Sequence, residues 1–174
     1  MAQTFLNLSQ GVTGTLPTSN YVQGGITEAD QFRLTTTFDG SSNPITSNWE
    51  RNDTVFDKIG TGITNSSGTF SFPSTGIYKV EFLAISNKSS TSQYSAVKIN
   101  ITTDNSSYTE RATGYSHVGI AGAWSGGYVQ TNIDVTDIAN VKVQFGVVNQ
   151  AVTSFIGSTN ANKTTVTFTR LGDT

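Results

Sequence analysis

The stretch Gly68-Thr69-Phe70-Ser71-Phe72-Pro73-Ser74-Thr75-Gly76-Ile77-Tyr78-Lys79-Val80-Glu81-Phe82 contains the strongest structural signal in this chain. Apolar side chains alternate with polar ones before Pro73 and again after Gly76, which is the spacing of a β-strand with one face in a core. Pro73 has no N–H and ends the first strand, while Gly76 gives the backbone freedom to turn a corner. The stretch therefore predicts two strands joined at a corner, with these core-facing side chains: Phe70 and Phe72 before it, and Tyr78, Val80 and Phe82 after it.

The same alternation recurs along the chain, between clusters of Gly, Ser and Asn that are typical of turns. Ala, Leu, Glu and Lys are sparse, so no long amphipathic helix is expected. Many short strands separated by turns favour a sandwich or barrel. The pattern predicts an all-β fold, with strands at 32–38, 69–72, 76–86, 95–103, 128–135, 140–149 and 164–171.

Length and composition narrow the classes of function. The 174 residues suit one domain with a filled core. Charged residues make up 13%, and the formal net charge of −2 shows no basic excess, so nucleic acid is not expected as a partner. The chain has no cysteine, which excludes disulfides and thiolate metal sites. The first residues hold no basic segment and no continuous apolar run, so we expect neither a signal peptide nor membrane insertion.

Residues 1–28 differ from the rest because they lack strict alternation and hold several glycines among polar residues. We interpret them as an extended tail that precedes a jelly-roll domain at 29–174. Two short apolar groups favour docking of the tail on a partner, although a merely flexible leader is the alternative. These anchors are Phe5, Leu6 and Leu8 in the first group, and Val12 and Leu16 in the second.

The stretch 68–82 resembles the signature of complement-q-type globular heads, the trimeric jelly-roll proteins related to tumour necrosis factor. That signature has Phe, a short polar step, Pro-x-x-Gly-x-Tyr and then an alternating aromatic strand. Residues 125–135 followed by 141–145 are similar to a later strand pair of the family, although 136–140 replaces its usual Gly-Asp turn. The resemblance covers residues 30–172. It implies a ten-stranded-type jelly-roll β-sandwich that assembles as a homotrimer.

Two other segments resemble bacteriophage proteins. Residues 8–17 are similar to a segment of phage fibre proteins, and 48–52 with 59–63 resemble jelly-roll heads of phages, among them marine ones. No Gly-x-y repeat is present, which argues against the complement role itself. The resemblance implies a virion protein that decorates the capsid or forms a head fibre and contacts other virion proteins through its tail. The alternatives are a tail-fibre tip that binds a host-surface glycan or protein, and a secreted cell-surface binding module.

Groups suited to catalysis are few. His117 is the single histidine, and its surroundings lack the spacing of a nucleophile elbow. One histidine without cysteine also disfavours zinc. The carboxylate pairs Glu28 with Asp30 and Asp134 with Asp137 could serve a glycosidase, but proximity in sequence does not establish the separation that this reaction needs. We therefore predict that the protein is not an enzyme and has no cofactor.

Calcium is a candidate ligand because four loop residues carry oxygens suited to a hard cation: Asp39, Asn43, Asp104 and Asn105. None of them matches an EF-hand loop, and turn formation explains the same residue types. No metal site is therefore predicted.

An aromatic group surrounds the glycine-rich region 114–127. Such amphipathic rings among small residues are common on recognition surfaces. Burial in an interface around a threefold axis is favoured for Trp124 and Tyr128, with an exposed recognition surface as the alternative. The full group is Tyr108, Tyr115, Trp124 and Tyr128.

Overall fold

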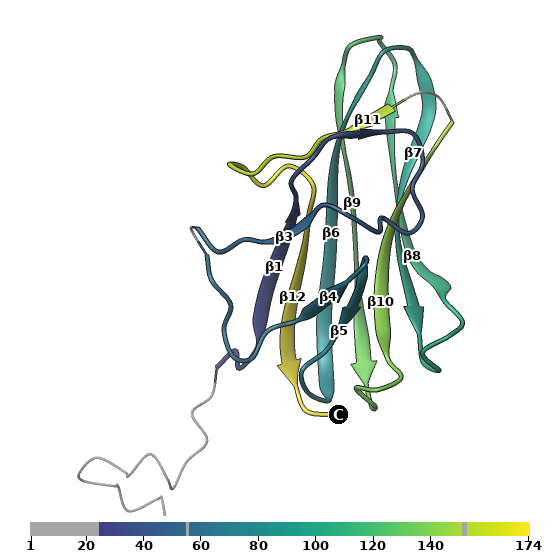
Figure 1. Cartoon of the computed structure of the whole chain (residues 1–174). Helices are drawn as coiled ribbons and strands as arrows, with labels where there is room; N and C mark the ends of the chain where they lie inside the picture. The colour runs from purple at the N-terminus through teal and green to yellow at the C-terminus, as the bar shows by residue number, and fades with distance from the viewer. Residues whose placement is uncertain (1–24, 55, 151–152) are drawn as a thin grey trace, which may run out of the picture.

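The computed structural model describes residues 25–54, 56–150 and 153–174, which contain twelve β-strands and no helix (Figure 1). The predicted all-β class is confirmed. In chain order the strands are β1 (Ala29–Leu34), β2 (Phe38–Asp39), β3 (Trp49–Arg51), β4 (Thr64–Ser66), β5 (Thr69–Ser71), β6 (Gly76–Lys88), β7 (Ser92–Thr102), β8 (Thr109–Val118), β9 (Trp124–Val135), β10 (Lys142–Asn149), β11 (Thr153–Phe155) and β12 (Thr165–Gly172).

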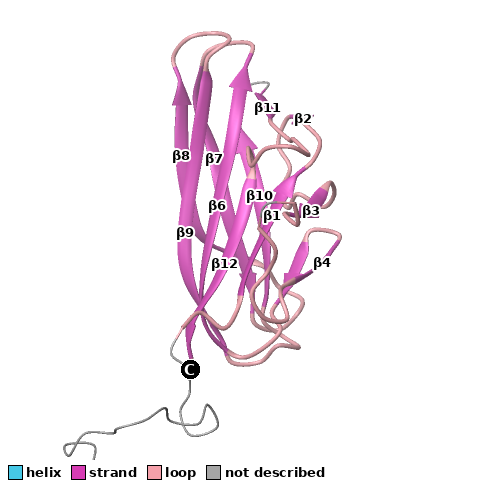
Figure 2. Cartoon of the chain, turned by 90° about the vertical axis from the view of Figure 1, so that its left-hand side faces the viewer, coloured by secondary structure: helices cyan, strands magenta, loops and turns pink. Residues whose placement is uncertain are grey.

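The strands form two antiparallel sheets that pack into a jelly-roll sandwich. In the first sheet β6 pairs on one side with β9 and on the other with β12, which continues to β1 and β3; beyond the end of β12, β11 pairs with β6 and leads to β2. The second sheet has the order β4-β5-β10-β7-β8. Figure 2 shows β9, β6 and β12 running side by side along the domain. Alternation of apolar and polar residues accounts for this arrangement, because each sheet has one buried face.

A cluster of aromatic rings fills the core between the sheets. Phe70 is fully buried, and its ring lies 5.2 Å from that of Phe32, 5.7 Å from that of Trp49 and 5.2 Å from that of Phe145. These edge-to-face contacts add to the stabilisation that comes from burying the apolar surface. The structure places all five apolar residues of the sequence signature in this core: Phe70, Phe72, Tyr78, Val80 and Phe82.

The corner between β5 and β6 requires a glycine. Gly76 has a φ of 137°, and a Cβ on it would lie 2.5 Å from the carbonyl oxygen of Gly172. The phenol of Tyr78 donates to the Ser74 carbonyl oxygen at 3.1 Å, which closes the corner over Pro73. The chain therefore turns where the sequence pattern predicted.

The predicted strand at 32–38 is wrong in its extent, because the chain leaves the sheet after Leu34. The N–H of Thr35 donates to the Asn48 carbonyl oxygen, and the backbone of Gly157 packs against Thr36. Pairing resumes only at Phe38, against β11 instead of β12. The run of threonines has suitable strand propensity, but tertiary contacts interrupt it.

The largest strand that the pattern did not predict is β8, and β9 begins four residues before the predicted 128. Residues 114–127 were interpreted as a glycine-rich surface region, whereas most of them belong to these two strands. The positions of β8 that face inward carry Ala112, Gly114 and Ser116. These residues are too small and polar to produce a visible apolar alternation.

The two ends of the domain differ in what they carry. β1 begins and β12 ends at the same end (Figure 1), where the N–H of Arg170 donates to the Glu28 carbonyl oxygen at 2.9 Å. The connections 89–91 and 119–123 lie at the opposite end. The five apolar anchors of the predicted tail lie outside the described residues.

Candidate functional site

The structure brings two of the four predicted aromatic residues together. Trp124 and Tyr128 are four residues apart on β9 and point to the same side, away from the core. Their side chains are 60% and 49% exposed. They belong to a surface that we call the β6–β9 face, formed by the outward side chains of β6, β9 and β12.

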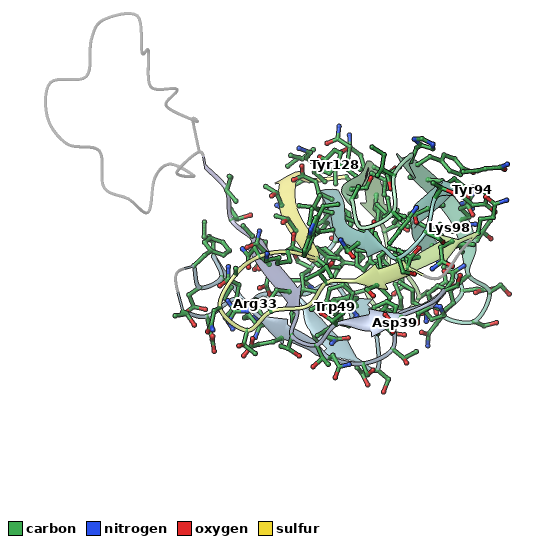
Figure 3. All side chains as sticks on the ribbon, turned by 90° about the horizontal axis from the view of Figure 1, so that it is seen from above. Arg33, Asp39, Trp49, Tyr94, Lys98 and Tyr128 are labelled. Carbon is green, nitrogen blue, oxygen red and sulfur yellow. The ribbon has the colours of Figure 1, made fainter. Side chains whose placement is uncertain are left out.

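The other two aromatic residues lie elsewhere. Tyr115 is on β8 in the second sheet, where its ring meets that of Tyr94 at 5.9 Å. Tyr108 lies in the connection between β7 and β8 and is half-buried. In the end-on view of Figure 3, Tyr94 lies apart from Tyr128. The four residues therefore do not form one surface.

The β6–β9 face is apolar toward the end of the domain where Trp124 lies. Leu83 and Ile85 point outward from β6 and are half-buried, and the ends of their side chains lie beside Gly126 of β9, 3.9 and 3.4 Å from where a Cβ on it would be. Lys163 lies over the Trp124 ring, with its Nζ 5.5 Å from the ring centroid. Sequence reasoning missed Leu83 and Ile85, although both alternate with the core residues of their strand.

The middle of this face is polar and tightly hydrogen-bonded. The Tyr128 phenol donates to Glu81 Oε1 at 2.6 Å, and Lys79 Nζ lies 2.9 Å from the same oxygen. The hydrogen bond to Glu81 raises the pKa of Tyr128 to about 12. Burial raises the pKa of Glu81, but the bonds from Tyr128 and Lys79 outweigh it and leave the pKa below its usual value. Beside them is a hollow of about 190 Å³, lined by Glu81, Leu83, Tyr128, Thr165 and Thr167.

The first carboxylate pair, Glu28 and Asp30, stabilises the connection between β3 and β4 through hydrogen bonds. Asp30 is buried and accepts two hydrogen bonds from Arg51 Nε and Nη2 and one from the N–H of Ile63 at 2.7 Å. Glu28 accepts from the N–H groups of Thr61 and Gly62, both at 2.9 Å. These acceptors fix the chain between β3 and β4, so bonds within the fold occupy both carboxylates.

The two members of the second carboxylate pair, Asp134 and Asp137, lie in different surroundings. Asp137 stabilises its own turn by accepting from the N–H of Ala139 and from Asn140 Nδ2, both at 2.7 Å. Asp134 is exposed on β9. His117 is exposed on β8, and no carboxylate or hydroxyl hydrogen-bonds to it among the described residues. The structure therefore assembles no acid, base and nucleophile from these predicted candidates.

The four residues weighed for calcium belong to separate hydrogen-bond networks. Asp39 accepts from Ser154 at 2.6 Å, and Asn43 accepts from Asn100 at 2.7 Å. Asp104 accepts from the N–H of Ser107 at 2.7 Å, and this bond is the first cause that lowers its pKa to about 2. Asn105 follows it with a φ of 56°. Across the residues that the structure describes, no three His, Asp or Glu side chains gather as a metal site would require.

Comparison with known proteins identifies the fold. No protein family model and no curated protein matches the sequence. Among solved structures, Eiger TNF from S. frugiperda superposes with a TM-score of 0.64 at 14% identity, over 84% of this chain and 93% of that one. Murine APRIL gives 0.60 at 9%, over 83% and 98%. The PRD1 vertex protein P5 gives 0.56 at 14%, over 86% and 100%.

These structures place the domain among jelly rolls of the tumour necrosis factor type. The predicted fold class is therefore confirmed, and one of the similar structures is a phage vertex protein. No helix in the part of the chain that the structure describes is long and apolar enough to cross a membrane.

Proposed function

We propose that the protein is a non-enzymatic structural protein of a virus particle, a homotrimer that decorates the capsid or forms a short head fibre. In this proposal the β6–β9 face packs around the threefold axis, and residues 1–28 attach the trimer to the particle. The sequence resemblance to phage proteins and the likeness to the PRD1 vertex protein support it.

The observation that carries the proposal is the distribution of aromatic and aliphatic side chains on the outward side of the first sheet. Trp124 and Tyr128 lie exposed beside Leu83 and Ile85, where a sheet facing water would carry polar side chains. A second copy would remove this apolar surface from water. Stable interfaces between permanent partners bury about 2,000 Å² or more and are largely apolar.

The assembly is tested by the mass of the purified protein in solution. We expect the full chain to be a trimer, near three times 18.5 kDa. Trp124→Asp should shift the protein to monomer at micromolar concentration, because a carboxylate would be buried against apolar surface. Tyr115→Asp is the matched control, since Tyr115 is an aromatic residue at least as exposed as Trp124, at 70% against 60%, but lies on the second sheet.

Two results would contradict the proposed assembly. One is a monodisperse monomer of the unchanged chain at micromolar concentration. The other is equal disruption by both substitutions, because the β6–β9 face would then have no special role.

The place on the particle is tested by deleting residues 1–24. The shortened protein should still form trimers but should be missing from particles assembled with it.

A role as the tip of a tail fibre is the second candidate. The exposed side chains of Tyr115 and Ile120 favour it, because they lie near the end of the domain opposite the start of β1. Particles that lack the protein and still adsorb to host cells normally would exclude this second candidate as the principal receptor-binding protein.

A further inference from the structure

The sandwich has an open side where the edge strands of its two sheets meet. β8 is the last strand of the second sheet, and β9 is the outer strand of the first. They approach closely at Gly114, where a Cβ would lie 2.1 Å from the Tyr128 carbonyl oxygen. Farther along, at Arg111 and Asp134, a groove of about 300 Å³ lies between them.

The groove combines an apolar floor with polar walls. Ile101, Ile133 and Val141 are core residues, each less than a tenth exposed, and they form its floor. A floor of this kind with a few converging polar groups is the usual composition of a site for a small molecule. The polar wall residues come from both sheets: Thr103, Arg111, Thr131, Asn132 and Asp134.

A β-bulge in β8 changes the direction in which the Arg111 side chain points. Ile99 pairs with Ala112 and Asn100 pairs with Glu110, so Arg111 is the extra residue of the bulge in β8. Bulges at sheet edges turn a side chain out of the regular alternation. Here the turned side chain is one of those that line the groove.

Arg111 also differs from the other arginines in having no side-chain partner in the part of the chain that the structure describes. Arg33 pairs with Glu50, Arg51 with Asp30, and Arg170 with Asp173. Neither Arg111 nor Asp134 forms an ion pair or a side-chain hydrogen bond within the described residues. The groove therefore offers five N–H donors of a guanidinium that the fold itself does not use.

We propose that this groove binds a sugar that carries a carboxylate, of the uronic or sialic acid class. The Arg111 guanidinium pairs with the carboxylate in the two-pronged geometry that this side chain favours. Asp134, Asn132 and the threonines bind the hydroxyl groups. The C–H side of the sugar ring packs on the apolar floor, which removes that surface from water.

A single unpaired arginine beside an aspartate is suited to one carboxylate, and not to a polyanion such as nucleic acid, which needs several cations along its backbone. The groove lies within one protomer, at the edge of β9 that faces β8, and its residues Asn132 and Asp134 point outward from β9 and so border the β6–β9 face. Calorimetry measures binding in the groove and the mass of the protein in solution measures assembly, so failure of one proposal is distinguishable from failure of the other.

Titration calorimetry on the full-length protein tests the site, with glucuronic acid and N-acetylneuraminic acid as probes and glucose as the neutral control. We expect the unchanged protein to bind at least one acid in preference to glucose, with an affinity that falls as salt is added. Arg111→Gln should weaken this binding at least ten-fold. Lys58→Gln, which removes one positive charge from an exposed loop elsewhere, should leave it unchanged.

Arg111→Lys keeps the charge but loses the paired donors, so its affinity should fall between those of the unchanged protein and Arg111→Gln. It also serves as the folded variant if Arg111→Gln fails to fold, which circular dichroism would reveal. Three results would overturn the proposal: no binding of either acid, equal binding of glucose, or full affinity in both Arg111 variants.

Discussion

On the β6–β9 face the Tyr128 phenol donates a hydrogen bond of 2.6 Å to Glu81 Oε1. This bond raises the pKa of Tyr128 to about 12, from the usual 10.0. Because the pKa in the folded protein lies above that of the unfolded chain, the stabilisation is fully present below pH 10 and is lost as the pH rises toward 12. Glu81 has a lowered pKa, so its contribution is lost instead in acid, as the carboxylate becomes protonated.

Replacing the carboxylate tests this contact directly. Glu81→Gln removes the charge that holds the phenol proton, so the pKa of Tyr128 should fall toward 10. The measurement is a tyrosinate absorbance titration, with Tyr128→Phe subtracted to isolate the one residue from the other tyrosines. An unchanged Tyr128 titration in Glu81→Gln would show that the hydrogen bond does not set its pKa.

Lys88 is a buried lysine that the alternation along β6 does not predict. It occupies an inward position at the end of β6, where the alternation from Tyr78 to Ala84 predicts an apolar side chain. Among the residues that the structure describes, its Nζ has no hydrogen-bond partner, and burial lowers its pKa. The pattern indicates which way a side chain points, but it does not show how far the apolar core extends along the strand.

Among the strands, the contact between β8 and β9 depends on a residue without a side chain. A Cβ on Gly114 would lie 2.1 Å from a backbone oxygen of β9, which cannot move aside as a flexible side chain can. At Gly126 on β9 the nearest atom to such a Cβ is the end of the Ile85 side chain, at 3.4 Å. The two glycines therefore form a matched pair for substitution.

We expect Gly114→Ala to lower the free energy of unfolding by about 1–3 kcal/mol, the usual cost of forcing extra atoms into a packed region. Gly126→Ala should change it by much less. Chemical denaturation of both variants, with the groove's acid-sugar binding as a second readout, measures the difference. Equal stability of the two variants would mean that β8 and β9 can separate at Gly114 without cost.

The strands that the sequence predicts are those with an apolar inward row. From Tyr78 to Phe82, and from Val141 to Val147, each inward position carries an apolar residue that is fully or almost fully buried. β8 lacks such a row because it is an edge strand, where contact with β9 requires small residues. The groove was not predictable either. Its lining comes from strands that are distant in sequence, and Arg111 points there only because of a bulge.

The two ends of the whole domain differ, and the difference follows from the topology. β1 starts and β12 finishes at the same end of the sandwich, where the C-terminus also lies (Figure 1). The connection 119–123 lies at the other end, and Ile120 within it is 75% exposed. If residues 1–28 attach the trimer to a particle, the C-terminus faces the particle surface and the 119–123 connection faces outward.

This orientation is measurable with epitope tags on intact particles. A short tag inserted after Ile120 should bind antibody, because the connection is exposed and the insertion interrupts no strand. The same tag added after Thr174 should be shielded on particles yet accessible on the purified trimer, which serves as the folding control for each tagged protein. The reverse pattern on particles would place the attachment at the 119–123 end. Equal access to both tags would mean that the domain stands free of the surface, as expected of a fibre tip and not of a capsid decoration.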